Sequence, residues 1–158
     1  MNSINNNFFE LNSENYPNLD NYKIGIVVSE WNYDITKKLS DGAKDKLIEL
    51  GVKENNICIT FVPGSFELIY ACKELSKKDF DVIIAVGCVI KGETDHYDYI
   101  CSSVSNGIAQ LNATGSVPII FCVLTDHSKD QSLARSGGKY GNKGHESAIA
   151  AIKMVTLK

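Results

Sequence analysis

A continuous apolar run, DVIIAVGCVI at positions 81–90, constrains the fold of this chain more than any other stretch. Its length and its β-branched residues are typical of a strand buried on both faces, as the strands of parallel sheets are. The sequence KGETD then turns the chain, and from Asp95 onward apolar residues recur near the helical repeat. Positions 87–100 therefore predict a strand whose carboxyl end leads through a glycine turn into a helix.

The rest of the chain repeats this strand-then-helix pattern. The alternation predicts an α/β fold: a three-layer αβα sandwich with a four-stranded parallel sheet and flavodoxin-like topology. Ser65 is the expected N-cap of the second helix. We expect strands within 22–31, 56–64, 81–90 and 116–126, and helices within 34–51, 65–78, 95–111, 128–138 and 141–158.

Residues 1–20 form a polar, asparagine-rich leader, and residues 21–158 are expected to form one domain. A leader of this composition is usually disordered. Its one apolar patch, Phe8, Phe9 and Leu11, could instead add a strand to this sheet or to the sheet of a neighbouring subunit. The sequence leaves both alternatives open.

Charge and hydropathy exclude several classes of protein. The net charge is −3 and the basic residues are scattered, so no nucleic-acid or polybasic membrane surface is indicated. The apolar runs are far shorter than the roughly 20 residues of a membrane-spanning helix, and the N-terminus lacks a signal pattern, so we expect a cytoplasmic protein. The five cysteines lie in apolar patterns without a CxxC pair, which predicts reduced buried thiols; the alternative is a redox or zinc role.

Polar and aromatic residues follow each expected strand. Ligands of open α/β sheets bind at the carboxyl ends of the strands, so we expect these segments to converge in one composite pocket. Three histidines and the acids show no spacing typical of a metal site. The converging residues are Trp31 and Asn32, then 64–67, then 92–96, then Phe121 with the helix of Arg135 beyond.

The chemistry of these residues suits ligands that contain a planar ring and a phosphate group. Trp31 could stack on a heterocycle, and the glycine turn before His96 could bind an anion. Arg135 and Lys143 could hold a phosphate, and the imidazole of His96 could transfer protons. Each residue also has an ordinary alternative, namely packing, helix capping or surface solvation.

Several motifs in order give this chain a family resemblance. Together they closely resemble 6,7-dimethyl-8-ribityllumazine synthases, which catalyse the penultimate step of riboflavin biosynthesis. The resemblance covers nearly the whole chain beyond the leader, and an ordered set is far more specific than any single motif. The motifs are Trp31 with Asn32, VPGSFE at 62–67, GCVIKGETDHYDY at 87–99, VPIIFCVLT at 117–125, Arg135, and GNKG at 141–144.

The resemblance implies a transferase that needs no metal or organic cofactor. It condenses 5-amino-6-(D-ribitylamino)uracil with 3,4-dihydroxy-2-butanone 4-phosphate and releases the lumazine, phosphate and water. By position, Trp31 matches the aromatic that stacks on the pyrimidine, with Asn32 beside it among the substrate-binding residues. Ser65 and Phe66 match residues that bind ring or ribityl groups through the backbone, and Glu67 matches the acid that holds ribityl hydroxyls.

The remaining matches surround the reacting groups. Cys88, Val89 and Ile90 match the strand end that borders the pyrimidine and the ribityl chain. Glu93 and Thr94 match the phosphate turn.

Four further residues match functional positions of the family. Arg135 matches the main phosphate ligand, and Lys143 a basic residue near it. Phe121 matches an aromatic contributed across a subunit boundary, and His96 the proposed proton donor and acceptor.

The resemblance also implies an assembly. The family forms homopentamers with active sites between adjacent subunits, and some members build icosahedral capsids from them. The segment SGGKYGNKG carries no insertion, which favours a shell over a free pentamer, although both stay open. The family further allows an association with riboflavin synthase. Two other classes are a non-catalytic flavin- or nucleotide-binding module and a structural shell protein without turnover.

Overall fold

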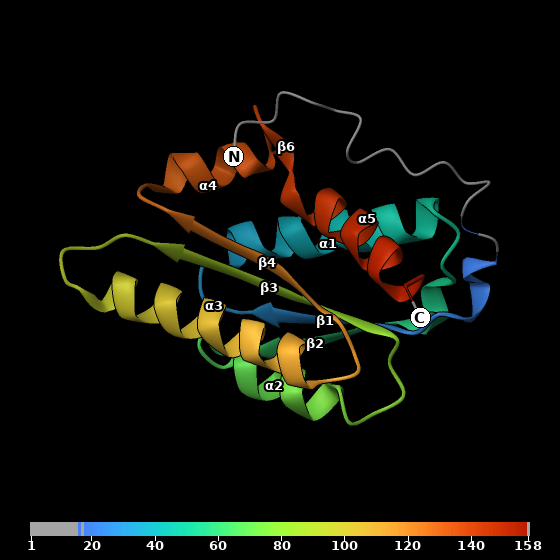
Figure 1. Cartoon of the computed structure of the whole chain (residues 1–158). Helices are drawn as coiled ribbons and strands as arrows, with labels where there is room; N and C mark the ends of the chain where they lie inside the picture. Colours follow the sequence, from blue (N-terminus) through green and yellow to red (C-terminus); the bar gives the residue numbers. More distant parts are fainter. Residues whose placement is uncertain (1–15, 17, 158) are drawn as a thin grey trace.

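A computed structural model describes Tyr16 and residues 18–157 of the chain, and its centre is a parallel sheet (Figure 1). All three neighbouring strand pairs of this sheet are parallel, in the order β2-β1-β3-β4. The α/β sandwich with a four-stranded parallel sheet predicted from the alternating pattern is thus confirmed. The strands are β1 (Ile24–Ser29), β2 (Ile57–Val62), β3 (Val82–Ile90) and β4 (Ile119–Asp126).

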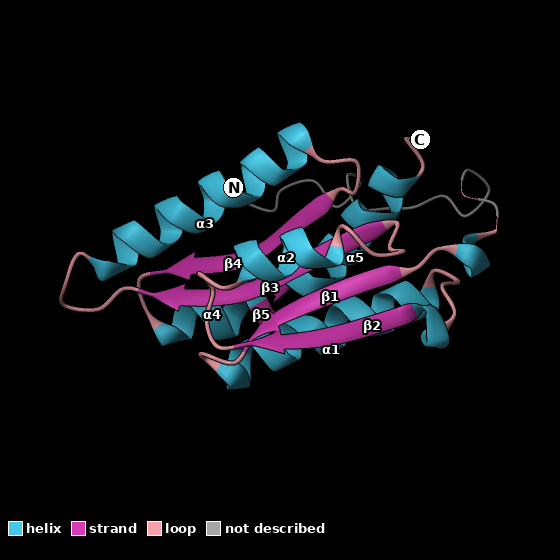
Figure 2. Ribbon diagram, turned by 90° about the horizontal axis from the view of Figure 1, so that it is seen from below, coloured by secondary structure: helices cyan, strands magenta, loops and turns pink. Residues whose placement is uncertain are grey.

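Helices cover both faces of the sheet (Figures 1 and 2). One face is covered by α1 (Tyr33–Glu49), α4 (Lys129–Arg135) and α5 (Lys143–Val155). The opposite face is covered by α2 (Leu68–Leu75) and α3 (His96–Thr114). Two single-turn 3₁₀ helices, η3 (Leu19–Asn21) and η4 (Glu54–Asn56), precede β1 and β2.

The apolar run of β3 lies between two hydrophobic cores. Successive side chains of a strand point to opposite faces of the sheet, so one run supplies both cores. The length of the run follows from this position, because neither face of the strand has room for a polar side chain. Val82, Ile84, Val86 and Cys88 pack with α1 and α5, whereas Ile83 and Ala85 pack with α2 and α3.

Helices α1 and α5 approach each other closely at Gly144. A Cβ atom at this position would overlap the main-chain carbonyl oxygen of Leu39 and lie 2.9 Å from the amide nitrogen of Ala43. Asn142 caps α5 by accepting from the Gly144 N–H at 2.8 Å, and its amide donates to the Lys38 carbonyl at 2.9 Å. Only glycine permits this contact between the two helices.

The structure corrects two expectations about local elements. Helix α2 begins at Leu68, and its N-cap residue is Glu67, so the prediction of Ser65 as the N-cap is wrong. The helix expected over 128–138 ends at Arg135. A short antiparallel hairpin of β5 (Ser136–Gly138) and β6 (Gly141–Asn142) follows instead. Gly137 and Gly141 have φ of 111° and 77°, and this left-handed backbone favours a turn over a helix.

The cysteines are free thiols, but not all are buried. Cys72, Cys88 and Cys122 are buried as expected, and Cys101 is half-buried. Cys58 is exposed, which contradicts the prediction. The reason is its place on β2, an edge strand of the sheet.

Some expectations concern parts of the chain that the structure does not describe. The apolar patch at Phe8, Phe9 and Leu11, and any strand that it adds to a sheet, lie outside the described residues. Among the helices of the described chain, none is long and apolar enough to cross a membrane.

Candidate active site

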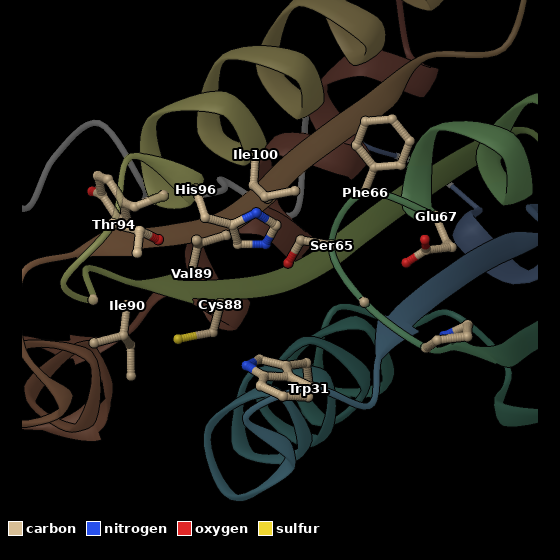
Figure 3. Close-up of a pocket in the computed structure, with 14 residues that line it drawn as sticks. Trp31, Ser65, Phe66, Glu67, Cys88, Val89, Ile90, Thr94, His96 and Ile100 are labelled. Atoms are coloured by element: carbon tan, nitrogen blue, oxygen red, sulfur yellow. The ribbon is translucent and has the colours of Figure 1, made fainter.

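A cleft of about 680 Å³ lies at the carboxyl ends of β1, β2 and β3 (Figure 3). Its volume is typical of a pocket for a small-molecule ligand. The wall combines loops after β1 and β2, the last residues of β3, the glycine turn and the first turn of α3. The lining residues are Trp31, Pro63, Gly64, Ser65, Phe66, Glu67, Cys88, Val89, Ile90, Gly92, Thr94, His96, Tyr97 and Ile100.

Parallel pairing brings the first two loops together. Ser29, the last residue of β1, is the register partner of Val62, the last residue of β2. The backbone bonds continue past the strands, because the Trp31 N–H donates to the Pro63 carbonyl at 3.0 Å. The indole of Trp31 is left 73% exposed within the cleft. An exposed aromatic face beside a concave surface is suited to stacking on a planar ring.

Asn32 supports the cleft from outside its lining. Its backbone is left-handed, with φ 58°, and its side-chain amide donates to the main-chain carbonyl of Cys88 at 3.0 Å. Among the described residues that line the cleft, Asn32 does not appear. The residue therefore ties the loop after β1 to the end of β3.

The turn before α2 presents hydrogen-bonding groups to the cleft. Within the described chain, no backbone acceptor takes the N–H groups of Ser65 and Phe66. The Ser65 hydroxyl is buried and has no hydrogen-bond partner among the described residues. A Cβ atom at Gly87 would lie 2.7 Å from this hydroxyl, so β3 needs glycine where the turn crosses it. The carboxylate of Glu67 closes the same side (Figure 3).

His96 is the first residue of α3 and extends its imidazole into the cleft toward Ser65 (Figure 3). The amino end of this nineteen-residue helix, which points at the glycine turn, attracts anions through its free N–H groups. Gly92 and Thr94 of the turn line the cleft, whereas Glu93 is exposed and is not among the lining residues.

Tyr97 and Ile100 are lining residues that the sequence reasoning missed. Burial is the main cause that raises the pKa of the Tyr97 phenol. The Lys91 ammonium lies 5.6 Å from its ring centroid, and the His127 ring packs edge-on at 6.1 Å. Their spacing from His96 could have indicated this, because residues one and four positions after the first residue of a helix lie close to it in the first turn.

Cys88 belongs to the wall of the cleft as a neutral thiol. Burial raises its pKa to about 11, and a hydrogen bond with Ser132 opposes this shift. At neutral pH such a group packs as a small apolar side chain rather than acting as a nucleophile. Val89 and Ile90 continue the same apolar wall (Figure 3).

Phe121 lies away from the cleft, which corrects the expected convergence of all four segments within one chain. It pairs with Ala85 in the middle of β4, rather than at the strand's carboxyl end. It is 42% exposed and lines a second groove of about 430 Å³ on the open edge of the sheet.

Arg135 and Lys143 also lie outside the lining of the cleft. Arg135 is the sole arginine of the sequence. Its guanidinium donates to the Gln131 carbonyl at 3.0 Å and lies 5.1 Å from the ring centroid of Tyr140. Lys143 donates to both carboxylate oxygens of Glu146, at 2.7 and 2.8 Å.

The charge partners of these two cations differ. No carboxylate of the described chain pairs with Arg135, so its charge is available to an anion from outside. Lys143 is already neutralised by Glu146. Within the described residues, no group of three or more histidine, cysteine or acidic side chains could hold a metal ion.

Comparisons with known proteins identify the family of this chain. The model of a family described as 6,7-dimethyl-8-ribityllumazine synthase matches residues 21–158. A protein of that name from Christiangramia forsetii is 53% identical over 155 residues, covering 97% of this chain and 92% of the relative. Those from Flavobacterium johnsoniae and Bacteroides fragilis are 48% and 53% identical, covering 100% and 84% of this chain and 84% and 94% of the relatives.

Proposed function

Because this chain belongs to the 6,7-dimethyl-8-ribityllumazine synthase family, enzymes of riboflavin biosynthesis, we propose that its cleft is where a lumazine forms. The substrates are 5-amino-6-(D-ribitylamino)uracil and 3,4-dihydroxy-2-butanone 4-phosphate, and phosphate and water leave. This reaction makes the chain a transferase. One observation carries the proposal: an exposed indole, unpaired backbone donors, an acid and a histidine line the same cleft.

The pyrimidine substrate fits the side of the cleft between Trp31 and the turn before α2. The indole stacks on the ring, and the N–H groups of Ser65 and Phe66 donate to its carbonyl oxygens. Glu67 accepts hydrogen bonds from ribityl hydroxyls. The apolar wall of Cys88, Val89 and Ile90 excludes water from the ring, because it offers no hydrogen-bonding side chain toward it.

The phosphate of the ketone belongs at the glycine turn. Thr94 and the first N–H groups of α3 face this part of the cleft, and the helix end favours a negative charge there. Glu93 lies in the same turn and contributes its backbone. Arg135 supplies the charged fork that a phosphate binds most strongly.

Proton transfer is the chemical task left to the protein. The amine of one substrate condenses with the ketone of the other and expels one water, phosphate is eliminated, and ring closure expels a second water. Holding two already reactive molecules together supplies most of the acceleration. His96, beside both the turn and Ser65, takes and returns protons as each bond forms or breaks.

A second copy of the chain completes the site in this proposal. Phe121, Arg135 and Lys143 lie outside the cleft of their own chain, whereas Trp31 is 73% exposed on its open side. Helix α3 spans nineteen residues but buries only Val104 and Ile108 among the described contacts, which leaves a surface for a partner. We therefore place Phe121, Arg135 and Lys143 of each copy in the site of its neighbour.

The assembly follows from a site shared in this way. A head-to-tail contact closes into a ring, and the family resemblance makes that ring a homopentamer. Rings stacked into an icosahedral capsid, and an association with riboflavin synthase, extend the same proposal. The cytoplasm is the proposed location.

A turnover assay tests the function directly. The protein is mixed with both substrates, and the absorbance of the lumazine is followed. An enzyme makes product, whereas a flavin-binding module or an inert shell protein does not. The absence of product at substrate concentrations well above those of ordinary metabolites would overturn the proposal.

A further inference from the structure

One chain of hydrogen bonds joins four segments behind the cleft. The Asn32 amide donates to the Cys88 carbonyl at 3.0 Å, and the Cys88 thiol donates to the Ser132 hydroxyl at 3.4 Å. Ser132 in turn donates to a carboxylate oxygen of Asp126 at 2.7 Å. The main-chain carbonyl of Asp126 accepts from the Lys91 N–H at 3.0 Å. The chain thus runs from the loop before α1, through β3 and α4, to the end of β4.

Asp126 fixes the direction of these bonds. An ionised carboxylate only accepts, so the Ser132 hydroxyl must donate its proton to Asp126. The Ser132 oxygen then has a free lone pair for the thiol of Cys88. Both Ser132 and Cys88 are almost completely buried, and a buried polar group without its partner is costly. The hydrogen bonds from Cys88 to Ser132 and from Ser132 to Asp126 therefore have a fixed direction, and water does not easily replace them.

Ser132 is the one fully buried residue of α4 within the described structure. Helix α4 has only seven residues. At its amino end Ser128 caps the helix and Lys129 pairs with exposed Asp34. At its carboxyl end the Ala134 carbonyl accepts from the Tyr140 N–H at 2.8 Å. The bond to Asp126 attaches the one buried polar side chain of α4 to the end of β4, and Arg135 lies three positions further along the helix.

Asp126 is attached to both elements that the proposed function assigns to phosphate. Its backbone holds Lys91, the residue immediately before the Gly92 turn. Its carboxylate, through Ser132, holds the helix that ends in Arg135. Among the described residues, Asp126 makes no direct bond to the pyrimidine side, which Asn32 connects to it only through Cys88 and Ser132. Trp31 is held by its backbone bond to Pro63, which continues the pairing of β1 with β2.

We propose that Asp126 and Ser132 are positioning residues for the phosphate-bearing substrate. This inference rests on the proposed function, which assigns Arg135 and the glycine turn as ligands of the phosphate. Neither residue touches substrate. In a ring of copies each Asp126 serves two sites, since it holds the turn of its own cleft and the Arg135 of the next one.

The test compares four variants of the full chain with the unmodified protein. Ser132→Ala and Asp126→Ala remove the link, whereas Asp126→Asn keeps an amide oxygen that can accept from Ser132. Ser128→Ala is the matched control, because it weakens the same helix at its cap without touching the link. Calorimetry measures the affinity for inorganic phosphate, and steady-state kinetics give the KM of each substrate. Thermal unfolding verifies that each variant is folded.

The expected result is a split between the two substrates. Ser132→Ala and Asp126→Ala each lower the affinity for inorganic phosphate and raise the KM of the ketone phosphate, both about tenfold. Loss of a charge-assisted hydrogen bond has an effect of this size. The KM of the pyrimidine stays within about twofold in both. Asp126→Asn and Ser128→Ala stay within about threefold of the unmodified protein on every measure.

Three results would overturn the proposal. Ser128→Ala could match Ser132→Ala, the pyrimidine KM could rise as much as that of the ketone, or Asp126→Asn could behave like Asp126→Ala. Should Ser132→Ala fail to fold, the half-exposed Asp126 still supplies the comparison. Phosphate binding by calorimetry does not depend on turnover, so a protein that binds phosphate but makes no lumazine refutes the proposed function alone.

Discussion

His96 and Arg135 occupy different places, so their substitutions should differ in consequence. His96 lies in the cleft, and general acid–base catalysis typically contributes a factor of roughly 10²–10⁴. We expect His96→Ala to lower kcat within that range and to leave detectable activity. Arg135→Ala should cost more, because loss of the proposed charged phosphate ligand removes binding and orientation together. Steady-state kinetics of both variants test this ranking.

The control for this comparison is another histidine. The His127 ring packs against the edge of Tyr97, and the main-chain N–H of His127 donates to the Gln131 side chain at 2.9 Å. His127 is not among the described residues that line the cleft. His127→Ala should therefore keep kcat within about twofold. Near-complete loss of activity in His96→Ala, together with a near-normal rate in Arg135→Ala, would reverse the ranking.

Single residues also mark where sequence reasoning succeeded and where it stopped. Trp31, Glu67 and His96 were predictable, because each follows a strand and parallel strand ends share one edge. The position of Phe121 was not, because it depends on the register of β4 against β3. The link between Asp126 and Ser132 was equally hidden, since neither residue belongs to a motif. Ser65 was misread as a cap because its hydroxyl faces the cleft wall rather than the backbone of α2.

At the scale of helices and strands, the contact between α1 and α5 offers a sharp test. A Cβ atom at Gly144 meets backbone atoms of α1, which cannot move away as a side chain can. Gly144→Ala should lower the free energy of unfolding by about 3 kcal/mol. Chemical denaturation measures this loss. Gly92→Ala is the control for folding, because its added Cβ meets nothing within 4 Å and should change stability far less.

Because of the buried thiols, the free energy of unfolding should fall at high pH. Burial raises the pKa of Cys72 to about 12, above its ordinary value of 9.0. Above pH 9 the unfolded chain loses this proton while the folded chain retains it, so stability is complete below that pH and falls as pH rises toward 12. At pH 10.5 the loss from Cys72 amounts to about 2 kcal/mol.

A variant without this thiol isolates its contribution. Cys72→Ala is less stable at neutral pH because of the cavity, but its free energy of unfolding should fall less steeply between pH 8 and pH 10.5. Cys58→Ala removes an exposed thiol and should keep the slope of the unmodified protein. Parallel slopes for the unmodified protein and Cys72→Ala would contradict the assignment.

At the scale of the whole molecule, a shared site predicts complementation. In the proposed assembly, His96→Ala and Arg135→Ala damage opposite faces of the contact between copies. When the two variants are co-expressed, random assembly gives about a quarter of the sites both intact residues. We expect activity near that fraction of the unmodified protein, far above either variant alone. Activity no higher than the average of the two separate variants would show that each site is built from one chain.

The particle size separates the two proposed assemblies. Light scattering of the complemented and unmodified proteins gives the mass of the particle in solution. A shell should scatter as a single large species. A pentamer-sized particle across pH and phosphate concentration would end the shell hypothesis and leave the shared site intact.

Trp31 is the sole tryptophan of the sequence, and it stands largely exposed in the cleft. Its emission is therefore an intrinsic probe of occupancy that needs no label. A stacked pyrimidine should quench this fluorescence, so a simple titration of the unmodified enzyme reports the filling of the ring side. Nothing else in the chain absorbs and emits as an indole does, so the signal comes from that one position.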